Sequence, residues 1–239
     1  MTIIFKFHKL LTLVRGINAV YVAELIHVWK SYTDVYVLRG VNLLVRGGEV
    51  VGIVGRSGVG KTTMVKLIGL LDRADLGVVR ILGRDVSNLS DSEASRLRLK
   101  EIGIIPQQFN LIPHLTVLEN IELPLYLQGV KKSERRVKAL EMLKRFELQH
   151  LASRYPNELS SGEQQRVLAI RAFIKSPKIV LADEPTAYLD VENSRMIYDM
   201  FKELISEYNS SVIITATNPD EVLLNCRKYL LSNGMLKEI

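Results

Sequence analysis

The sequence is poor in the residues that build disulfides and metal sites. Among its 239 residues it has one cysteine, Cys226, and four histidines, His8, His27, His114 and His150. A single thiol excludes an internal disulfide and a metal cage built from thiolates. The histidines show no metal-ligand spacing. We therefore expect Cys226 to be a small side chain that faces the core.

Long hydrophobic runs are also missing. A membrane-spanning helix needs about twenty consecutive apolar residues, and charges interrupt every apolar stretch well before that length. In the N-terminal extension, residues 1–22, the apolar core at 10–14 is too short for a signal peptide and no small-residue cleavage site follows it. This extension could form a helix on a membrane surface, pack on the globular part, or reflect an upstream start codon. The surface-helix interpretation depends on basic and apolar side chains in one segment: Lys6, Lys9, Arg15, Phe5, Phe7 and Leu11.

Charges of both signs are present, with 32 basic residues, 26 acidic residues and a net charge of +6. The basic excess is spread along the chain, so it suits small anionic partners such as nucleotides or lipid head groups, and we expect no nucleic-acid partner. Apolar residues make up 47% of the chain and no repeat interrupts it. This composition predicts one compact domain with subdomains.

Residues 55–62 contain three glycines and end in a lysine and a threonine. The apolar run 49–54 before them predicts a buried strand, and 61–71 has the apolar spacing of a helix. A strand, a glycine loop and a helix in this order form a phosphate-binding loop, whose backbone N–H groups point at the phosphates. The alternative is an ordinary glycine-rich turn. The residues expected at the phosphates are Gly55, Arg56, Ser57, Gly58, Val59, Gly60, Lys61, Thr62 and Thr63.

Three side chains of this loop have separate expected roles. Lys61 can reach the β- and γ-phosphates as a point charge. Thr62 can place its hydroxyl on Mg²⁺, and Thr63 is a lesser phosphate contact. The loop therefore predicts a bound nucleoside triphosphate with Mg²⁺.

A second apolar run, Lys178–Asp183, predicts another buried strand that ends in the acidic pair Asp183 and Glu184. Successive residues of a strand face opposite sides, so the two carboxylates can do different work. We expect Asp183 to align with the metal ion and Glu184 to aim at a water molecule. Taken alone, such a strand end is more often a turn signal or a helix cap, but the phosphate-binding loop favours the catalytic interpretation.

A third motif, Leu159–Arg166, has the sequence LSSGEQQR and opens a predicted helix that runs to Phe173. Here the chain resembles the ATP-binding cassette (ABC) ATPases, whose signature is LSGGQ. The resemblance covers about residues 23–236 and extends to other motifs. It implies that Tyr32 stacks on adenine, that Gln107 senses the γ-phosphate and helps hold Mg²⁺, and that Asp190 ends the D-loop at the nucleotide site. The implied signature contacts to ATP are Ser160, Ser161, Gly162 and Glu163.

The resemblance also implies a mechanism. Two subunits would form a head-to-tail dimer around two ATP–Mg²⁺, each held between the phosphate loop of one subunit and the signature of the other. Closure on ATP and opening after hydrolysis would drive an integral membrane permease docked near Gln107. The sequence does not distinguish a homodimer from a heterodimer with another ABC ATPase. The expected location is cytoplasmic, at the inner face of the cell membrane, through the permease.

The segment Ile102–Pro124 resembles one branch of the family, which powers lipoprotein release, macrolide or peptide export and cell-division complexes. A rival function is a non-transport ABC ATPase, a slow ATP-gated scaffold or regulatory switch. The resemblance of this segment to the export branch, and the presence of one short cassette, favour a transporter subunit over the rival function.

Three positions depart from the family pattern. Ser161 replaces the first signature glycine, and Glu163 replaces the glutamine. After a predicted strand at 212–215 the chain continues Ala-Thr-Asn-Pro, where the family has Thr-His-Asp-Pro, so Thr217 occupies the position of the catalytic switch histidine. Threonine is shorter and carries no charge, so it would reach the γ-phosphate only through water. Slow hydrolysis is the expected consequence, and Thr217 also favours the rival function.

The fold class is α/β: a P-loop NTPase core with a parallel sheet, an antiparallel β arm and an inserted helical subdomain. The ABC ATPase domain is expected at 23–239, with the helical subdomain at about 92–173. Within it, an amphipathic surface helix is expected to place Val137, Leu140, Leu143 and Phe146 on one side. The remaining expected strands are two arm strands at 35–45 and 78–82 and a terminal hairpin at 229–231 and 235–239.

Overall fold

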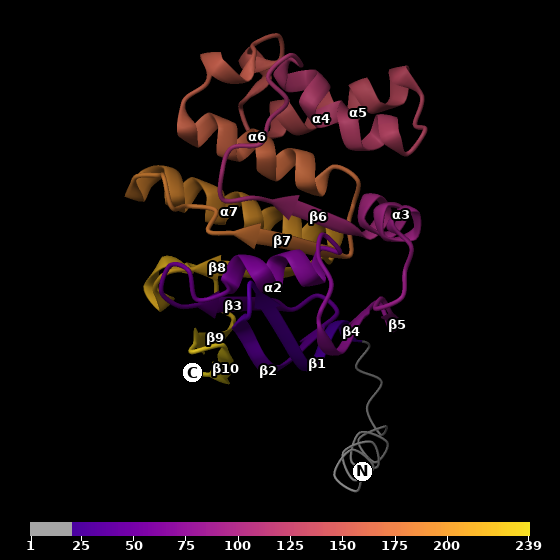
Figure 1. The fold of residues 1–239 in the computed structure, drawn as a ribbon. Coiled ribbons are helices and arrows are strands. Elements are labelled where there is room, and N and C mark those ends of the chain that lie inside the picture. The colour runs from indigo at the N-terminus through magenta and orange to yellow at the C-terminus, as the bar shows by residue number, and fades with distance from the viewer. Residues whose placement is uncertain (1–20) are drawn as a thin grey trace, which may run out of the picture.

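The structure is a computed structural model, and it describes residues 21–239. Its centre is a six-stranded sheet with the order β10-β9-β3-β8-β7-β6 (Figure 1). Neighbouring strands run parallel except β9 and β10, which pair antiparallel. The bounds are β3 Val50–Val54, β6 Ile102–Ile105, β7 Ile179–Asp183, β8 Ser211–Ala216, β9 Arg227–Ser232 and β10 Met235–Glu238.

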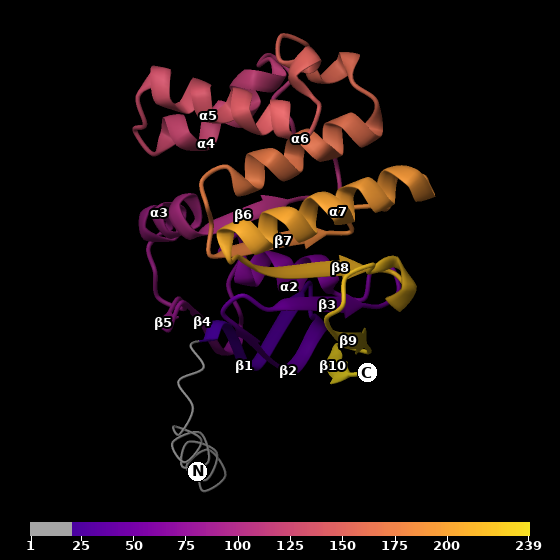
Figure 2. The same ribbon diagram turned by 180° about the vertical axis from the view of Figure 1, so that it is seen from behind.

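Helices cover both faces of this sheet. The helix α2 lies on the face toward the viewer in Figure 1, and α7 lies on the opposite face, in front of the sheet in Figure 2. The expected helix 61–71 ends earlier, at Ile68, because Gly69 caps it and Leu70 has a left-handed φ of 57°. The bounds are α2 Lys61–Ile68, α3 Asp91–Glu101, α6 Ser161–Phe173 and α7 Val191–Tyr208.

The strands are apolar along their whole length because both of their faces are covered. Every residue of β7 and β8 is buried. Leu181 and Ile213 belong to the core that includes α2, whereas Val180 and Ile214 belong to the core that includes α6 and α7. Such continuous apolar strands are typical of parallel sheets between two helical layers, and the strands expected at 49–54, 178–183 and 212–215 are confirmed.

A second, antiparallel sheet forms the arm, with the order β2-β1-β4-β5. The expected arm strands are confirmed in β2 and β4, whereas β1 was not expected as a strand. Thr33 and Asp34 join β1 to β2 with left-handed φ values of 45° and 66°, as a tight hairpin turn requires. The amide of Arg39 donates to the carbonyl of Gly234 at 2.7 Å, which ties β2 to the β9–β10 turn. The bounds are β1 Tyr21–Tyr32, β2 Val35–Arg46, β4 Leu76–Ile81 and β5 Arg84–Asp85.

Two helices, α4 (Val117–Leu127) and α5 (Lys132–Arg145), lie beyond α6, away from the sheet (Figures 1 and 2). The expected helical insert at 92–173 is interrupted, because β6 lies within that span and is the edge strand of the parallel sheet. The helix α3 contacts β6. The helical region proper therefore begins after β6.

The buried side of α5 differs from the expectation. Ala139, Met142 and Leu143 are buried, at the i, i+3, i+4 spacing of a helix that packs on one side. Val137 and Leu140 are 55% and 38% exposed, so the expectation was wrong for them, whereas Leu143 and Phe146 pack in the core as expected. Ala139 is fully buried, so the packed side of α5 includes Ala139 and excludes the exposed Val137. The helix α5 contacts α4.

The interpretations of the N-terminal extension fall on residues 1–20, outside the described residues. Tyr21 and Val22 belong to β1, so this strand starts before the expected domain boundary at residue 23. Within 21–239, none of the helices combines the length and the apolar character that crossing a bilayer requires.

Candidate nucleotide-binding site

The glycine loop lies between β3 and α2, as expected, and its backbone needs glycine. Gly58 and Gly60 have left-handed φ values of 76° and 113°. A Cβ atom on Gly60 would lie 2.7 Å from Cγ1 of Val37, which is too close for any side chain. A loop of this shape, at the N-terminus of α2, turns its N–H groups toward an anion.

The side chain of Lys61 is buried, with 3% of its surface exposed. Its Nζ atom donates to the carbonyl oxygens of Gly55 at 2.6 Å and Arg56 at 3.1 Å. It also pairs with Oε1 of Glu184 at 2.9 Å. A buried ammonium requires such partners, and the lysine is therefore held across the loop with its charge compensated by a carboxylate.

Glu184 and Gln107 come together although they follow different strands. Glu184 follows β7 and Gln107 follows β6, and these strands are parallel neighbours that end at the same edge of the sheet. The side-chain Nε2 of Gln107 donates to Oε2 of Glu184 at 3.0 Å. The structure thus joins three of the expected catalytic residues, Lys61, Glu184 and Gln107, in one hydrogen-bonded group.

A cavity of about 280 Å³ opens over this group. It combines the end of the arm, the phosphate loop and the ends of two parallel strands. Its lining consists of Tyr32, Val37, Ser57, Gly58, Gly60, Lys61, Thr62, Thr63, Gln107 and Glu184. Nine of the ten were expected as site residues, and Val37 is the exception. All of them except Val37, Gly58 and Gly60 present a polar side chain.

Tyr32 ends β1 and is 40% exposed at the mouth of this cavity. Its hydroxyl donates to Oδ2 of Asp72 at 2.7 Å, and Lys30 donates to Oδ1 of the same carboxylate at 2.8 Å. Burial acts to raise the pKa of Asp72, but these two hydrogen bonds, together with one from the Arg73 amide and the charge of Lys30, outweigh it and the pKa lies below its ordinary value. Lys30 and Asp72 orient the ring, and no sequence motif marked either of them.

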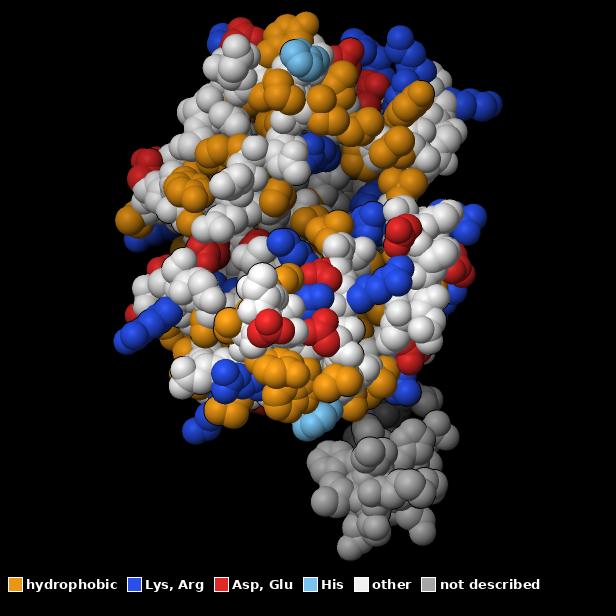
Figure 3. All heavy atoms as spheres, in the orientation of Figure 1, with side chains coloured by type: hydrophobic (Ala, Val, Ile, Leu, Met, Phe, Trp, Pro, Cys, Tyr) orange, Lys and Arg blue, Asp and Glu red, His pale blue; other side chains and the backbone are white. Residues whose placement is uncertain are grey.

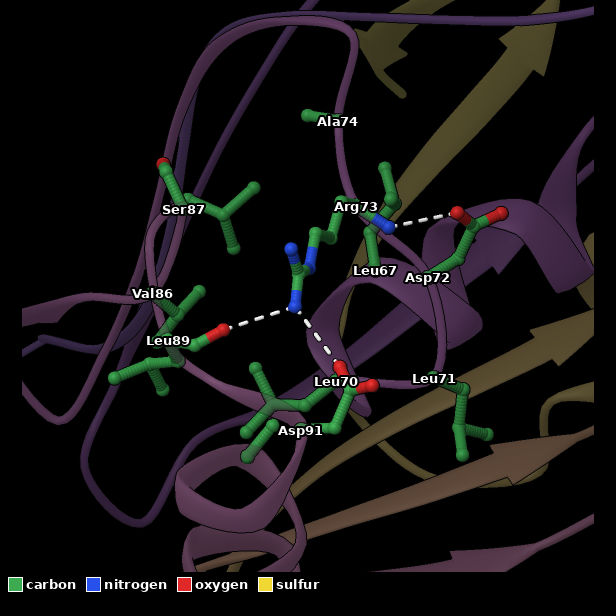
Figure 4. A pocket seen from close by; sticks show the side chains of 12 residues that line it. Leu67, Leu70, Leu71, Asp72, Arg73, Ala74, Val86, Ser87, Leu89 and Asp91 are labelled. Atoms are coloured by element: carbon green, nitrogen blue, oxygen red, sulfur yellow. Dashed lines mark hydrogen bonds and ion pairs between the residues drawn. The ribbon is translucent and has the colours of Figure 1, made fainter.

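A smaller cavity of about 90 Å³ lies beside Asp72 and Arg73 (Figure 4). The Arg73 guanidinium donates to the carbonyl of Leu89 and to Oδ1 of Asp91, both at 2.9 Å. The other side chains that line this smaller cavity are mostly leucine, valine and alanine. None of the expected nucleotide contacts lines this cavity.

Asp183 ends β7, is 4% exposed and does not itself line the cavity. Its Oδ1 atom accepts a hydrogen bond from the hydroxyl of Thr215 at 2.5 Å. The same hydroxyl accepts from the amide of Glu184 at 2.9 Å. Thr215 was not predicted to belong to the site.

The donor types near the loop fit Mg²⁺. The hydroxyl of Thr62, the carboxylate of Asp183 and the amide oxygen of Gln107 are all oxygen donors, which Mg²⁺ prefers. No three His, Cys, Asp or Glu side chains cluster as metal ligands within 21–239. Few protein ligands suit Mg²⁺, because it keeps several waters and binds through substrate phosphates.

The signature residues form the start of α6. Ser160 caps the helix by accepting from the amide of Glu163 at 3.3 Å, and the Glu163 carboxylate accepts from the Ser160 amide at 2.8 Å. The bond from the Ser160 amide holds the pKa of Glu163 below its ordinary value. The glutamate that replaces the family's glutamine thus completes a capping box. Ser161 is exposed.

Gly162 and Asp190 are linked through Asn193. The amide and side chain of Asn193 donate to the two carboxylate oxygens of Asp190 at 2.8 and 2.9 Å. A Cβ atom on Gly162 would collide with the side chain of Asn193. Neither the signature nor Asp190 lines the cavity of its own chain.

Thr217 follows β8 and is exposed. Its amide donates to Oε2 of Glu221 at 2.9 Å, and the side chain of Asn218 donates to Oε1 of the same glutamate. Thr217 does not line the cavity. Cys226 is half-buried against the core that includes α7, and burial raises the pKa of its thiol.

Charges of both signs are mixed on the face that carries α2, without a continuous basic patch (Figure 3). Apolar side chains gather on this face at two ends, over the arm and over the helical region. The positive charge that would attract an anionic ligand is therefore confined to the phosphate loop.

The fold and the site define a P-loop nucleoside-triphosphate-binding protein, because a glycine loop, a buried lysine and an acidic pair meet at one edge of a parallel sheet. The family model for the ABC transporter matches residues 38–187. The chain belongs to this family. It is an ATP-binding cassette and an ATPase.

Individual relatives agree with this assignment. The chain is 43% identical over 204 residues to the ABC transporter ATP-binding protein YtrE of Bacillus subtilis, covering 85% of this chain and 88% of YtrE. It is 39% identical over 211 residues to the lipoprotein-releasing system ATP-binding protein LolD of Cytophaga hutchinsonii, covering 87% and 95%. The expected branch resemblance is confirmed, since LolD carries the lipoprotein-release name.

A solved structure matches the whole cassette. It is the dimeric post-hydrolysis state of the ATP-binding cassette MJ0796, of Methanocaldococcus jannaschii, bound to ADP and Pi. The TM-score is 0.85 at 39% identity, covering 91% of this chain and 97% of that chain. The expected α/β fold class is confirmed.

Proposed function

We propose that the chain hydrolyses ATP within a head-to-tail dimer and thereby drives a separate membrane permease. The observation that carries the proposal is the group formed by Lys61, Glu184 and Gln107 at the floor of one cavity. Phosphoryl transfer to water needs a cation that binds the phosphates and a carboxylate that orients the water. Lys61 and Glu184 provide these two groups, and the amide of Gln107 lies beside the carboxylate.

The roles follow from the positions of the side chains. Lys61 binds the phosphates and stabilises the charge that grows on the transferred group. Thr62, Asp183 and the Oε1 atom of Gln107 would hold Mg²⁺, which, when bound, neutralises charge on the phosphate oxygens. Glu184 orients and polarises the attacking water. Tyr32 provides a stacking surface for adenine at the mouth of the cavity.

The second subunit completes the site. Ser160, Gly162 and Glu163 start a helix whose N-terminus favours an anion, but they do not line the cavity of their own chain. A head-to-tail dimer would bring them to the γ-phosphate of the other subunit, with Ser161 and Asp190 at the same interface. The dimeric solved relative supports this arrangement. A homodimer is the simplest form, and in a heterodimer another ABC ATPase would supply the second signature.

The transport role is supported by the names of YtrE and LolD, which are ATP-binding proteins of transport systems. The permease would dock near Gln107 and hold the chain at the inner face of the cell membrane. Flotation with vesicles tests this role. When the chain is co-expressed with the permease encoded beside it, the chain should float with the vesicles. Without that permease, the chain should remain in the fraction that does not float.

The rival function is a slow ATP-gated scaffold, and the exposed Thr217 outside the cavity favours it. The two functions differ in what ATP hydrolysis does. In a transporter subunit the permease and its cargo raise the rate of phosphate release. In a scaffold the rate stays low with or without a permease.

The nucleotide part of the proposal is tested with two matched lysine variants. Lys61→Ala removes the buried ammonium, whereas Lys66→Ala removes an exposed lysine from the same helix. Calorimetry should show loss of ATP binding in Lys61→Ala only. Equal ATP affinity in the two variants would contradict the assignment of the phosphate loop.

A further inference from the structure

One buried hydroxyl touches both residues of the acidic pair. Thr215 lies on β8 directly opposite Asp183 on β7 and is fully buried. Its Oγ1 atom donates to Oδ1 of Asp183 at 2.5 Å and accepts from the amide of Glu184 at 2.9 Å. A hydroxyl has one proton to give and lone pairs to accept with, and here both capacities are used on neighbouring residues of one motif.

The position of Thr215 in the strand decides where its hydroxyl points. Ile213 belongs to the core that includes α2, and Ile214 belongs to the core on the other face of the sheet. Because side chains alternate, Thr215 lies on the face of α2 and Ala216 on the opposite face. The hydroxyl is therefore on the side of the sheet where α2 presents Lys61.

The bond to Glu184 fixes an unusual backbone. Glu184 follows the last residue of β7 and has a left-handed φ of 45°, which a residue other than glycine seldom adopts. Its amide donates to Thr215 where the strand ladder has ended. The same residue directs its carboxylate to Lys61 and Gln107 in the cavity. The direction of that carboxylate thus depends on a backbone conformation that Thr215 holds.

We propose that Thr215 is a positioning residue, which sets the backbone of Glu184 and the carboxylate of Asp183 for ATP hydrolysis. The proposal rests on the proposed function for its consequence in catalysis. It does not require Thr215 to touch the nucleotide. Replacing the hydroxyl by a methyl group should misdirect the acidic pair while the phosphate loop keeps its shape.

The first test is a comparison of Thr215→Val with Thr215→Ser. Valine has a similar volume but no hydroxyl, and serine keeps the hydroxyl. We expect Thr215→Val to lower kcat by roughly tenfold or more, because a buried amide and a carboxylate lose their partner. The Kd for ATP should not rise, since Lys61 and Tyr32 are untouched. Thr215→Ser should stay close to the unmodified protein in both quantities.

The second test does not depend on hydrolysis. Hydrogen exchange of the Glu184 amide, followed by NMR in the nucleotide-free protein, reports the bond directly. Exchange should become roughly tenfold faster in Thr215→Val, and Thr215→Ser should restore slow exchange. Thr215→Ala provides a second variant without the hydroxyl if the valine protein does not fold. If the unmodified protein fails to hydrolyse ATP, this measurement still decides on Thr215 while the proposed function fails.

Three results would overturn the proposal. One is unchanged kcat and unchanged exchange of the Glu184 amide in both variants without the hydroxyl. Another is a serine variant as impaired as the valine variant, since the methyl group would then matter and not the hydroxyl. A parallel loss of ATP affinity and kcat would also count against positioning, because it indicates general damage to the site.

Discussion

The Nζ atom of Lys61 and the Oε1 atom of Glu184 lie 2.9 Å apart, in side chains that are 3% and 15% exposed. The proposed phosphate-binding cation and the proposed water-activating carboxylate therefore neutralise each other. We expect a triphosphate that enters the cavity to replace Glu184 as the partner of Lys61. This exchange would free the carboxylate for water when the phosphates arrive.

Removing the charge of Glu184 should tighten ATP binding. In Glu184→Gln, Lys61 has no competing carboxylate, and the γ-phosphate meets no like charge. We expect ATP to bind roughly three- to tenfold more tightly, which corresponds to about 1 kcal/mol, while hydrolysis is lost. Calorimetry measures the affinity. Glu141→Gln, an exposed glutamate of α5, is the matched control and should bind ATP like the unmodified protein.

Tyr32 should contribute to affinity through its ring and through the orientation of that ring. Tyr32→Ala removes the stacking surface and should weaken ATP binding by roughly 1–3 kcal/mol. Tyr32→Phe keeps the ring but loses the bond to Asp72, so its loss should be smaller. The same order should hold for ADP. If alanine at this position binds ATP with unchanged affinity, Tyr32 does not stack on the base.

The capping box of α6 should make stability depend on pH through Glu163. Its pKa in the folded chain lies below the ordinary 4.5, mainly through the bond from the Ser160 amide. The unfolded chain therefore takes up a proton first as pH falls, and the contribution of the box is full above pH 4.5 and is lost as pH falls through the folded pKa.

Glu163→Gln, which introduces the family's residue, tests this dependence. The free energy of unfolding should fall less steeply below pH 4.5 in the variant than in the unmodified chain. Urea unfolding at a series of pH values gives both curves. Identical slopes would show that the Ser160–Glu163 bond does not stabilise the folded chain.

The sequence predicted those parts of the site that follow a local pattern. The glycine loop and the strand ending in Asp183 are continuous segments, so periodicity and residue type were sufficient to find them. Tyr32 and Asp72 are 40 residues apart, and Asp183 and Thr215 are 32 apart. Each pair forms only when separate elements pack together, and neither Asp72 nor Thr215 belongs to a motif.

The strand β1 and the buried side of α5 were not predicted for a related reason. β1 contains Glu24, His27 and Lys30, so it lacks an apolar run that would predict a strand, and its pairing with β2 and β4 is irregular. Lys30 is buried only because Asp72 and Asp75 pair with it. In α5, the buried side depends on how the helix packs against the rest of the fold, including α4, and the sequence pattern alone favoured Val137.

We propose that Glu184 and Lys61 carry out ATP hydrolysis and that Thr217 limits its rate. The measurement is the rate of phosphate release from ATP–Mg²⁺ by the unmodified protein, Thr217→His and Glu184→Gln. We expect slow release by the unmodified protein, release faster by roughly tenfold or more in Thr217→His, and none in Glu184→Gln. If the unmodified protein is fast and Thr217→His leaves its rate unchanged, Thr217 does not limit hydrolysis. If hydrolysis survives Glu184→Gln, Glu184 does not activate the water.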